Sequence, residues 1–273
     1  MSQGVARILT AVVGIPIVVG AMYYGSWLFL GFIVLIGLVG QVEFVHMLRR
    51  SGWNVSVVWA LLGGVLWFSR YMVDWWQEGL LLLALLFGVS LLYTGVLRSL
   101  ERFAGTLAAV VYPTVFVSFL IDIRWNAESS LGSENSFWLI LMLFSLIWAT
   151  DTGAYYSGRT FGKHKLAPSV SPNKTWEGTI GGVVFAVAVA ALFKTQLLPM
   201  LSWVDVSALA LLGGVWGQLG DLLESAFKRA AGVKDSANIL PGHGGILDRF
   251  DSVLFTAPAY YLYLSHMTSF LAV

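Results

Sequence analysis

The sequence has 273 residues, of which 58% are hydrophobic and only 11% are charged, and its formal net charge is +1. Soluble globular domains contain about 25% charged residues, so this composition excludes an ordinary soluble fold, and the small net charge gives no support to nucleic-acid binding. The absence of cysteine excludes disulfides, thiolate metal ligands and a cysteine nucleophile. We therefore expect an integral membrane protein.

Apolar segments separated by polar breaks follow one another along the whole chain. Their lengths, about 16 to 22 residues, match helices that cross the roughly 30 Å hydrocarbon core of a bilayer. The spans are predicted at residues 6–24, 27–47, 54–69, 79–97, 104–121, 137–158, 177–198, 206–227 and 250–271. The first is interpreted as a retained span and not as a secretory signal, because no A-x-A-like cleavage site follows it. The predicted fold is an all-α polytopic membrane protein with about nine transmembrane helices and no strands, since helices satisfy their own backbone in lipid.

Lys and Arg fall almost entirely on one side of the membrane if these spans alternate. Thirteen lie on one side, at Arg7, Arg49, Arg50, Arg98, Arg102, Arg159, Lys163, Lys165, Lys174, Lys228, Arg229, Lys234 and Arg249. The other side has only Arg70, Arg124 and Lys194. Because cytoplasmic loops are enriched in Lys and Arg, we predict a cytoplasmic N-terminus and an outside C-terminus. The protein is expected in the cell (plasma) membrane.

The polar content of the chain suggests two regions. Residues 1–136 have short loops and few ionisable groups within spans, with Glu43 as the main exception. We interpret this region as the part that packs and faces lipid. Residues 137–273 contain longer cytoplasmic loops at 159–176 and 228–249, which are rich in Asp, Lys, Gly and Pro. This second region is predicted to be catalytic, with its active site facing the cytoplasm.

Two pairs of acidic residues flank the loop 228–249. Asp221 and Glu224 precede the loop, Asp248 and Asp251 lie at its end, and each pair is spaced three residues apart. This spacing places both members of a pair on one helix face. Acidic residues in or beside a span are costly and usually belong to a functional site. Carboxylates suit a hard cation that shares its coordination shell with phosphates, so we predict Mg²⁺ here, alone or with a second cation.

Basic residues and glycines accompany these carboxylates. The basic residues, which are candidates for binding phosphate oxygens, are Lys228, Arg229, Lys234 and Arg249. Gly242, Gly244 and Gly245 are expected to let backbone N–H groups approach an anion at the start of the last helix, and His243 is a candidate phosphate ligand or general base. The alternative is a solvated loop with helix-capping glycines. Two acidic pairs around a glycine-rich turn go beyond ordinary capping.

A second polar segment precedes the seventh span. Asp151 lies at the end of the sixth span, and the block SPNKTWEG contains Ser171, Lys174 and Glu177. The basic stretch between them is typical of a positive-inside loop, whereas Asp151 and Lys174 favour a binding site. The residues together predict a magnesium and phosphate site that an apolar-tailed, phosphate-bearing substrate reaches from the bilayer. Such chemistry needs charge neutralisation and alignment more than a strong base.

The segment SAFKRAAGVKDSANILPGHGGILDRFDS, residues 225–252, resembles the signature of phosphatidate cytidylyltransferases, the CDP-diacylglycerol synthases. The fixed positions are a Ser, Lys-Arg after two residues, Lys-Asp after four more, then His-Gly-Gly and Asp-Arg-apolar-Asp. The SPNKTWEG block and Asp151-x-x-Ala154-Tyr155 also resemble blocks of that family. The resemblance covers about residues 148–255 and is specific, because about ten positions are fixed within twenty-seven.

The resemblance implies that CTP and phosphatidic acid give CDP-diacylglycerol and pyrophosphate for phospholipid biosynthesis, in a Mg²⁺-dependent homodimeric membrane enzyme. The implied metal ligands are Asp221, Glu224, Asp248 and Asp251. The implied catalytic residues are Asp221, Lys228, Asp248, Asp251, Lys174 and His243. The implied substrate-binding residues are Ser171, Lys174, Glu177, Arg229, Lys234, Arg249 and Asp151. Two alternatives remain: a CTP-dependent prenyl-alcohol kinase of the dolichol or phytol type, and an ion-coupled transporter.

Overall fold

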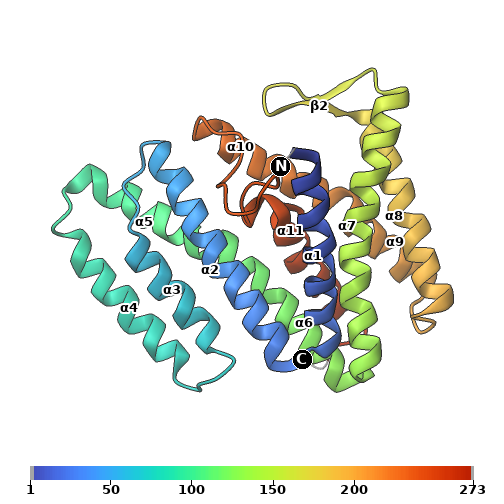
Figure 1. Cartoon of the computed structure of the whole chain (residues 1–273). Coiled ribbons are helices and arrows are strands. Elements are labelled where there is room, and N and C mark those ends of the chain that lie inside the picture. The colour runs from blue at the N-terminus through green and yellow to red at the C-terminus, as the bar shows by residue number, and fades with distance from the viewer. Residues whose placement is uncertain (1–2, 272–273) are drawn as a thin grey trace. The chain divides into compact units, whose positions relative to one another are not determined.

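The structure, a computed structural model, describes residues 3–271 and is largely helical (Figure 1). The first helices are α1 (Gln3–Tyr24), α2 (Ser26–Arg50), α3 (Val57–Ser69) and α4 (Trp76–Leu91). α5 (Val96–Val110) continues through a π-helical turn, Val111–Val115, into α6 (Phe116–Leu131), and α7 (Ser133–Phe161) and α8 (Trp176–Gln196) follow. α9 (Trp203–Leu211) continues through a second π-helical turn, Leu212–Trp216, into α10 (Gly217–Ala230), and α11 (Leu247–Met267) is the last helix.

The chain is a helical membrane protein. Five helices among the described residues are long and apolar enough to cross a membrane: Ser26–Arg50, Arg98–Leu131, Ser133–Phe161, Trp176–Gln196 and Trp203–Ala230. Val12–Tyr24, Val57–Ser69 and Trp76–Leu91 are shorter apolar helices. The helical membrane class is therefore confirmed, while the number of nine spans and the sides of the two termini stay predictions. The orientation was predicted from the positions of Lys and Arg. The side chain of one of these residues, Arg7, lies outside the part of the chain whose side chains are described.

The expectation of a chain without strands is wrong at one place. Lys165–Ala167 (β1) and Ser171–Thr175 (β2) pair antiparallel, with Lys165 opposite Thr175 and Ala167 opposite Ser171. The backbone argument against strands applies only inside the hydrocarbon core, and this hairpin belongs to the polar loop between α7 and α8. Thr175 then starts α8, because its hydroxyl accepts the N–H of Gly178 at 3.1 Å.

The chain forms two compact units that are interleaved along the sequence. Unit 1 consists of Gly31–Ser118, Phe227–Arg249 and the N-terminal piece that ends at Thr10. Unit 2 consists of Ala11–Leu30, Phe119–Ala226 and the C-terminal segment that begins at Phe250. Unit 1 thus joins part of the N-terminal half to the loop 228–249. The division of function at residue 136 stays a prediction.

Three aromatic rings attach the start of the loop 228–249 to α2 within unit 1. Phe44 of α2, Tyr112 of the first π-helical turn and Phe227 of α10 have ring centroids 5.1 to 5.5 Å apart. Phe44 and Tyr112 are buried. Aromatic pairs in this distance range contribute beyond their buried area. The residue directly before Lys228 is therefore held against the N-terminal half of the chain.

α7 and α8 of unit 2 pack closely because glycines face the neighbouring backbone. A Cβ added to Gly182 would lie 2.8 Å from the carbonyl oxygen of Thr150, and one added to Gly178 would lie 2.9 Å from that of Ala154. Small residues allow this approach between helices in membranes. The contact brings α7 beside the start of α8, where the hairpin ends.

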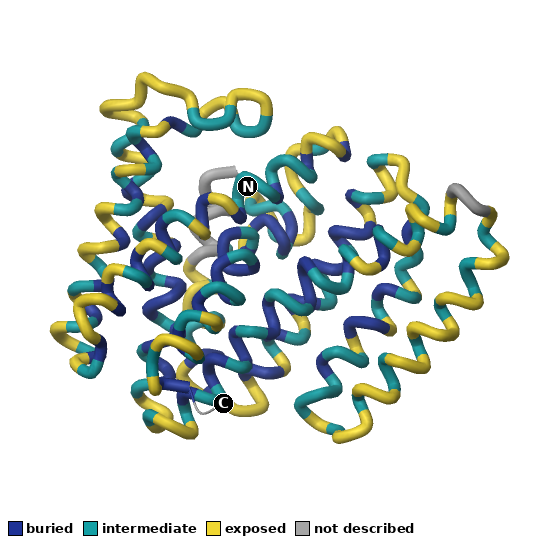
Figure 2. Tube along the Cα trace, turned by 180° about the vertical axis from the view of Figure 1, so that it is seen from behind, coloured by how far each residue is buried: buried dark blue, intermediate teal, exposed yellow. Residues whose placement is uncertain are grey.

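α4 of unit 1 presents apolar side chains outward along its length. No residue of α4 is buried (Figure 2). Leu81, Leu82 and Leu85 are 63%, 58% and 61% exposed. A helix that is apolar on all sides and open on most of them fits a lipid environment. This surface supports the membrane assignment independently of the length of the helix.

Unit 2 contains a fully buried arginine. Arg124 is 0% exposed, and its guanidinium donates to Glu128 at 2.8 Å, Ser136 at 2.7 Å and Ser133 at 3.1 Å. Its Nε also donates to the carbonyl oxygen of Met22 at 3.3 Å. One side chain therefore joins α1, α6 and α7, and its burial is offset only because each of these groups accepts a hydrogen bond.

We predict that Arg124→Ala lowers the free energy of unfolding by about 2 to 5 kcal/mol, because it opens a cavity at a fully buried position and leaves Ser136 and the carbonyl oxygen of Met22 without the donor. Thermal unfolding of the purified protein in detergent measures this change. Arg98→Ala, at an exposed position of α5, is the control and should leave the unfolding midpoint close to wild type. Equal midpoints for the two variants would contradict the prediction.

Candidate active site

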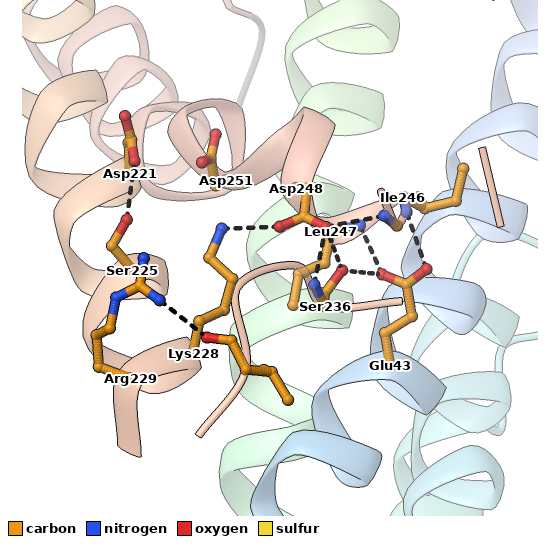
Figure 3. Close-up of polar contacts among 12 residues, drawn as sticks. Glu43, Asp221, Ser225, Lys228, Arg229, Ser236, Ile246, Leu247, Asp248 and Asp251 are labelled. Carbon is orange, nitrogen blue, oxygen red and sulfur yellow. Dashed lines mark hydrogen bonds and ion pairs between the residues drawn. The ribbon is translucent and has the colours of Figure 1, made fainter. Parts of the chain in front are cut away.

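The loop 228–249 of unit 1 is organised around the carboxylate of Asp248 (Figure 3). Asp248 lies in the first turn of α11 and is 7% exposed. Its Oδ1 accepts a hydrogen bond from Nζ of Lys228 at 2.7 Å. Its Oδ2 accepts from the N–H of Ser236 at 2.8 Å, the hydroxyl of Ser236 at 2.9 Å and the N–H of Gly245 at 2.8 Å. Both oxygens of Asp248 are therefore occupied by the chain itself.

The same contacts determine the charge of Asp248. Burial alone raises the pKa of its carboxyl, but the hydrogen bond from Lys228 and those from the backbone of Gly245 and Ser236 outweigh burial and hold the pKa below its usual value. Asp248 is thus a carboxylate at neutral pH. Lys228 is also buried, so its ion pair with Asp248 fixes the direction of the Lys228 ammonium group within the loop.

A second buried carboxylate, Glu43 of α2, lies on the other side of Ser236 (Figure 3). Glu43 is 2% exposed, and its Oε1 accepts from the N–H of Ile246 at 2.8 Å. Its Oε2 accepts from the N–H of Leu247 and the hydroxyl of Ser236, both at 2.8 Å. Near the start of α11, the N–H of Gly245 is therefore occupied by Asp248, and those of Ile246 and Leu247 are occupied by Glu43.

The two adjacent glycines of the loop are required for different reasons. Gly244 has φ +79°, a left-handed conformation that favours glycine. Gly245 is crowded, since an added Cβ would lie 2.1 Å from Oγ of Ser236 and 2.5 Å from Oε2 of Glu43. The glycines thus let the loop close around two carboxylates of the chain itself, which differs from the expected contact with a substrate anion.

Unit 2 contains a cavity of about 590 Å³ with several polar and charged side chains in its lining. Its polar lining includes Asp151, Tyr155, Arg159, Lys174, Gln218 and Asp221. Lys174 of β2 and Asp221 of α10 form an ion pair, with Nζ 2.7 Å from Oδ2. The hairpin therefore places a cation in the cavity wall. The structure brings together in this cavity three of the residues predicted from the sequence: Asp151, Lys174 and Asp221.

Asp221 and Asp251 lie where α10 and α11 approach each other in unit 2. A Cβ on Gly220 would come within 2.7 Å of the carbonyl oxygen of Asp251, so the two backbones are close at this point. Asp221 Oδ1 accepts from the hydroxyl of Ser225 at 3.2 Å, and Asp251 Oδ1 accepts from the N–H of Ser252 at 2.6 Å. Two carboxylates from adjacent helices are a donor set that suits Mg²⁺, which is often bound by one or two carboxylates together with substrate phosphates.

The model of the cytidylyltransferase family matches residues 5–267. The chain belongs to the cytidylyltransferase family. It is 37% identical over 270 residues to a phosphatidate cytidylyltransferase of Bacillus subtilis (strain 168). The aligned region covers 95% of this chain and 97% of the relative. The chain is 35% identical over 268 residues to one of Staphylococcus haemolyticus (strain JCSC1435), with 96% and 99% covered. The match extends the resemblance from residues 148–255 to nearly the whole sequence.

The other acidic residues predicted for the site of this cytidylyltransferase lie in different surroundings. Glu224 of α10 is fully buried. Glu177, in the first turn of α8, accepts the N–H groups of Lys163 and His164 and lies 2.6 Å from Nδ1 of His164, so it joins the start of α8 to the segment between α7 and β1. Within the described part of the chain no three His, Asp or Glu side chains could hold a metal together. The predicted set of four carboxylate ligands therefore stays a prediction.

The remaining predicted residues lie on the hairpin and the loop. Ser171 is half-buried on β2. Arg229 donates from Nη1 to the carbonyl oxygen of Val233 at 3.1 Å and is exposed, as are Lys234 and Arg249. The backbone N–H of His243 donates to the carbonyl oxygen of Leu240 at 2.9 Å. Contacts of these side chains with substrate stay predictions.

Two residues that contact Asp248 or its loop in unit 1, Ser236 and Glu43, were not among the predicted site residues. Ser236 carries no signal in the sequence that separates it from other loop serines. Glu43 did carry one, since an acidic residue within a span usually marks a site. The sequence also showed no sign of a cavity of about 480 Å³ in unit 1. His46, Arg49, Arg50 and Ser236 help to line this cavity. In the sequence, Arg49 and Arg50 served only to predict the orientation of the chain.

We predict that Asp248→Asn abolishes turnover and also lowers the free energy of unfolding by about 3 to 5 kcal/mol, because it leaves the buried Lys228 without its anionic partner. Thermal unfolding and turnover of the purified variant measure both effects. Adding Lys228→Met should restore part of the stability and none of the activity, since the buried ammonium group that Asp248 neutralised is then removed. An unchanged unfolding midpoint in Asp248→Asn would show that the pair contributes no stability.

Proposed function

We propose that the chain transfers the cytidylyl group of CTP to phosphatidic acid, giving CDP-diacylglycerol and pyrophosphate for phospholipid biosynthesis. The observation that carries this proposal is the family match over residues 5–267, with relatives of the same length named phosphatidate cytidylyltransferase. The cavity of unit 2 and the charged loop supply the kinds of side chain that this reaction requires.

The reaction joins two phosphate groups. A phosphate oxygen of phosphatidic acid attacks the α-phosphorus of CTP and forms the new P–O bond, while the bond from that phosphorus to the bridging oxygen of the β-phosphate breaks. Pyrophosphate leaves with the electron pair. Because the attacking phosphate is already anionic at neutral pH, the protein needs to neutralise charge and align the reactants more than to remove a proton.

The cavity of unit 2 is the proposed nucleotide site. Lys174 and Arg159 provide positive charge for the phosphates, and Asp151 and Gln218 provide hydrogen-bonding groups for the nucleoside. The ion pair with Asp221 keeps Lys174 extended into the cavity wall. In unit 1, Lys228 is proposed to contact a phosphate oxygen, and Asp248 holds its ammonium group in place.

Asp221 and Asp251 are the proposed ligands of Mg²⁺, because both are carboxylates at the close approach of α10 and α11. A bound divalent cation would neutralise charge on the phosphates of CTP and of the leaving pyrophosphate. Asp248 is a weaker candidate ligand in the described arrangement, since its oxygens accept four hydrogen bonds from the chain.

The proposal includes a location and an assembly. The excess of Lys and Arg on one predicted side supports nine alternating spans, a cytoplasmic N-terminus, an outside C-terminus and an active site that faces the cytoplasm. A bacterial relative of similar length supports the plasma membrane as the location. The homodimer rests on the resemblance to the family.

We predict that purified protein releases labelled pyrophosphate from CTP only when phosphatidic acid and Mg²⁺ are both present, and that CDP-diacylglycerol forms in equal amount. Thin-layer chromatography of the lipid and an assay of the released phosphate measure the two products. Release of CDP with a prenyl alcohol as acceptor would instead identify a lipid kinase. Solute flux into proteoliposomes without nucleotide would identify a transporter.

We predict that Asp221→Asn and Asp251→Asn each raise the Mg²⁺ concentration for half-maximal activity by roughly 10- to 100-fold, because each removes an oxygen donor near the metal. Mg²⁺ titrations at saturating CTP measure the shift. Asp74→Asn, at an exposed position before α4, should behave as wild type. Lys174→Met should weaken CTP binding without raising the Mg²⁺ requirement, because it frees Asp221 from its ion pair and removes no oxygen donor. Wild-type Mg²⁺ dependence in both Asp variants would overturn the ligand assignment.

A further inference from the structure

We propose that Glu43 is a positioning residue for the transfer reaction, because it holds the loop that carries Lys228 and Asp248 in its working geometry. This inference rests on the proposed function for its effect on catalysis. It assigns a role to a residue of α2, outside the segment that carries the signature resemblance.

The carboxylate of Glu43 holds the loop at two separate points. It is 2% exposed and accepts hydrogen bonds from the hydroxyl of Ser236 and from the N–H groups of Ile246 and Leu247, all at 2.8 Å (Figure 3). A buried carboxylate is tolerated only where donors replace its water shell. Here all three donors come from one loop, so satisfying the charge of Glu43 also fixes the shape of the loop.

One hydroxyl connects Glu43 to the predicted catalytic pair. Oγ of Ser236 lies 2.8 Å from Oε2 of Glu43 and 2.9 Å from Oδ2 of Asp248, so it contacts both carboxylates. Asp248 in turn accepts from Nζ of Lys228 at 2.7 Å. A displacement of Ser236 therefore reaches Lys228 through a single intervening side chain. Glu43 itself acts through these residues and need not touch substrate.

α2 is anchored on either side of Glu43 within unit 1. Gln41 is buried and its Nε2 donates to the carbonyl oxygen of Ala60 at 2.8 Å. Phe44 packs on Tyr112 and on Phe227, with ring centroids 5.1 Å apart in both pairs. Because Phe227 directly precedes Lys228, α2 contacts both the start and the end of the loop. The helix is thus a fixed reference against which the loop is aligned.

Glu43→Gln tests the proposal, since glutamine keeps the size of the side chain but turns one acceptor into a donor that faces other donors. We expect kcat to fall by roughly 10- to 100-fold, because small displacements of catalytic groups have effects of this size, with little change in the KM for CTP or phosphatidic acid. Hydrogen exchange should accelerate at the amides of Ile246 and Leu247, which is a readout independent of activity.

Two further variants separate positioning from general destabilisation. Gly245→Ala leaves Glu43 intact but places a Cβ 2.1 Å from Oγ of Ser236, so it should reproduce the fall in kcat. Asp205→Asn is the matched control, because Asp205 is also buried and caps a helix, accepting from the N–H of Ser202 and the hydroxyl of Tyr263, both at 2.7 Å. It should lower thermal stability and retain wild-type kcat per folded molecule.

The outcomes decide between the possibilities. Wild-type kcat in Glu43→Gln, or unchanged exchange at residues 246 and 247, overturns the proposal. An equal loss of kcat in Asp205→Asn also overturns it, because the effect would then follow stability alone. If the wild-type protein transfers no cytidylyl group, the proposed function fails, and the exchange measurement still decides whether Glu43 holds the loop.

Discussion

The need to surround buried negative charge with hydrogen-bond donors shapes the loop 228–249. Glu43 and Asp248 are both excluded from water, and together they accept hydrogen bonds from Lys228, from Ser236 and from the backbone at residues 245–247. Each donor must reach its acceptor, which requires a left-handed Gly244 and leaves no room for a side chain at Gly245. Gly244, Gly245, Ser236 and Lys228 are thus parts of one electrostatic arrangement.

Features that depend on a local sequence pattern could be predicted from the sequence. Long apolar runs predicted helices that the structure contains, and the spacing of residues in 225–252 indicated the family that the comparisons show. The spacing of Asp248 and Asp251 predicted a shared helix face, but it could not say what each side chain would meet. Asp248 meets donors of its own loop in unit 1, whereas Asp251 belongs to unit 2.

Tertiary contacts account for what the sequence could not show. Glu43 and Leu247 are 204 residues apart, and no local pattern pairs them. The hairpin β1–β2 was missed because the argument against strands holds in lipid and not in a polar loop. It matters for the site, since β2 carries Lys174 to Asp221. α10 contributes residues to both units. Its acidic and basic side chains are close in sequence, but their partners belong to different units, which a local pattern could not show.

The pairing of Glu43 with the end of the loop also has a consequence for biosynthesis. Glu43 leaves the ribosome 204 residues before Leu247, which at about 5 to 20 residues per second corresponds to roughly 10 to 40 s. Throughout this interval the nascent helix α2 carries a carboxylate whose final donors are not yet all present. Because Glu43 lies near the end of α2, two turns before Arg50, we expect it to remain hydrated during this time. The loop can close around Glu43 only after translation has passed residue 247.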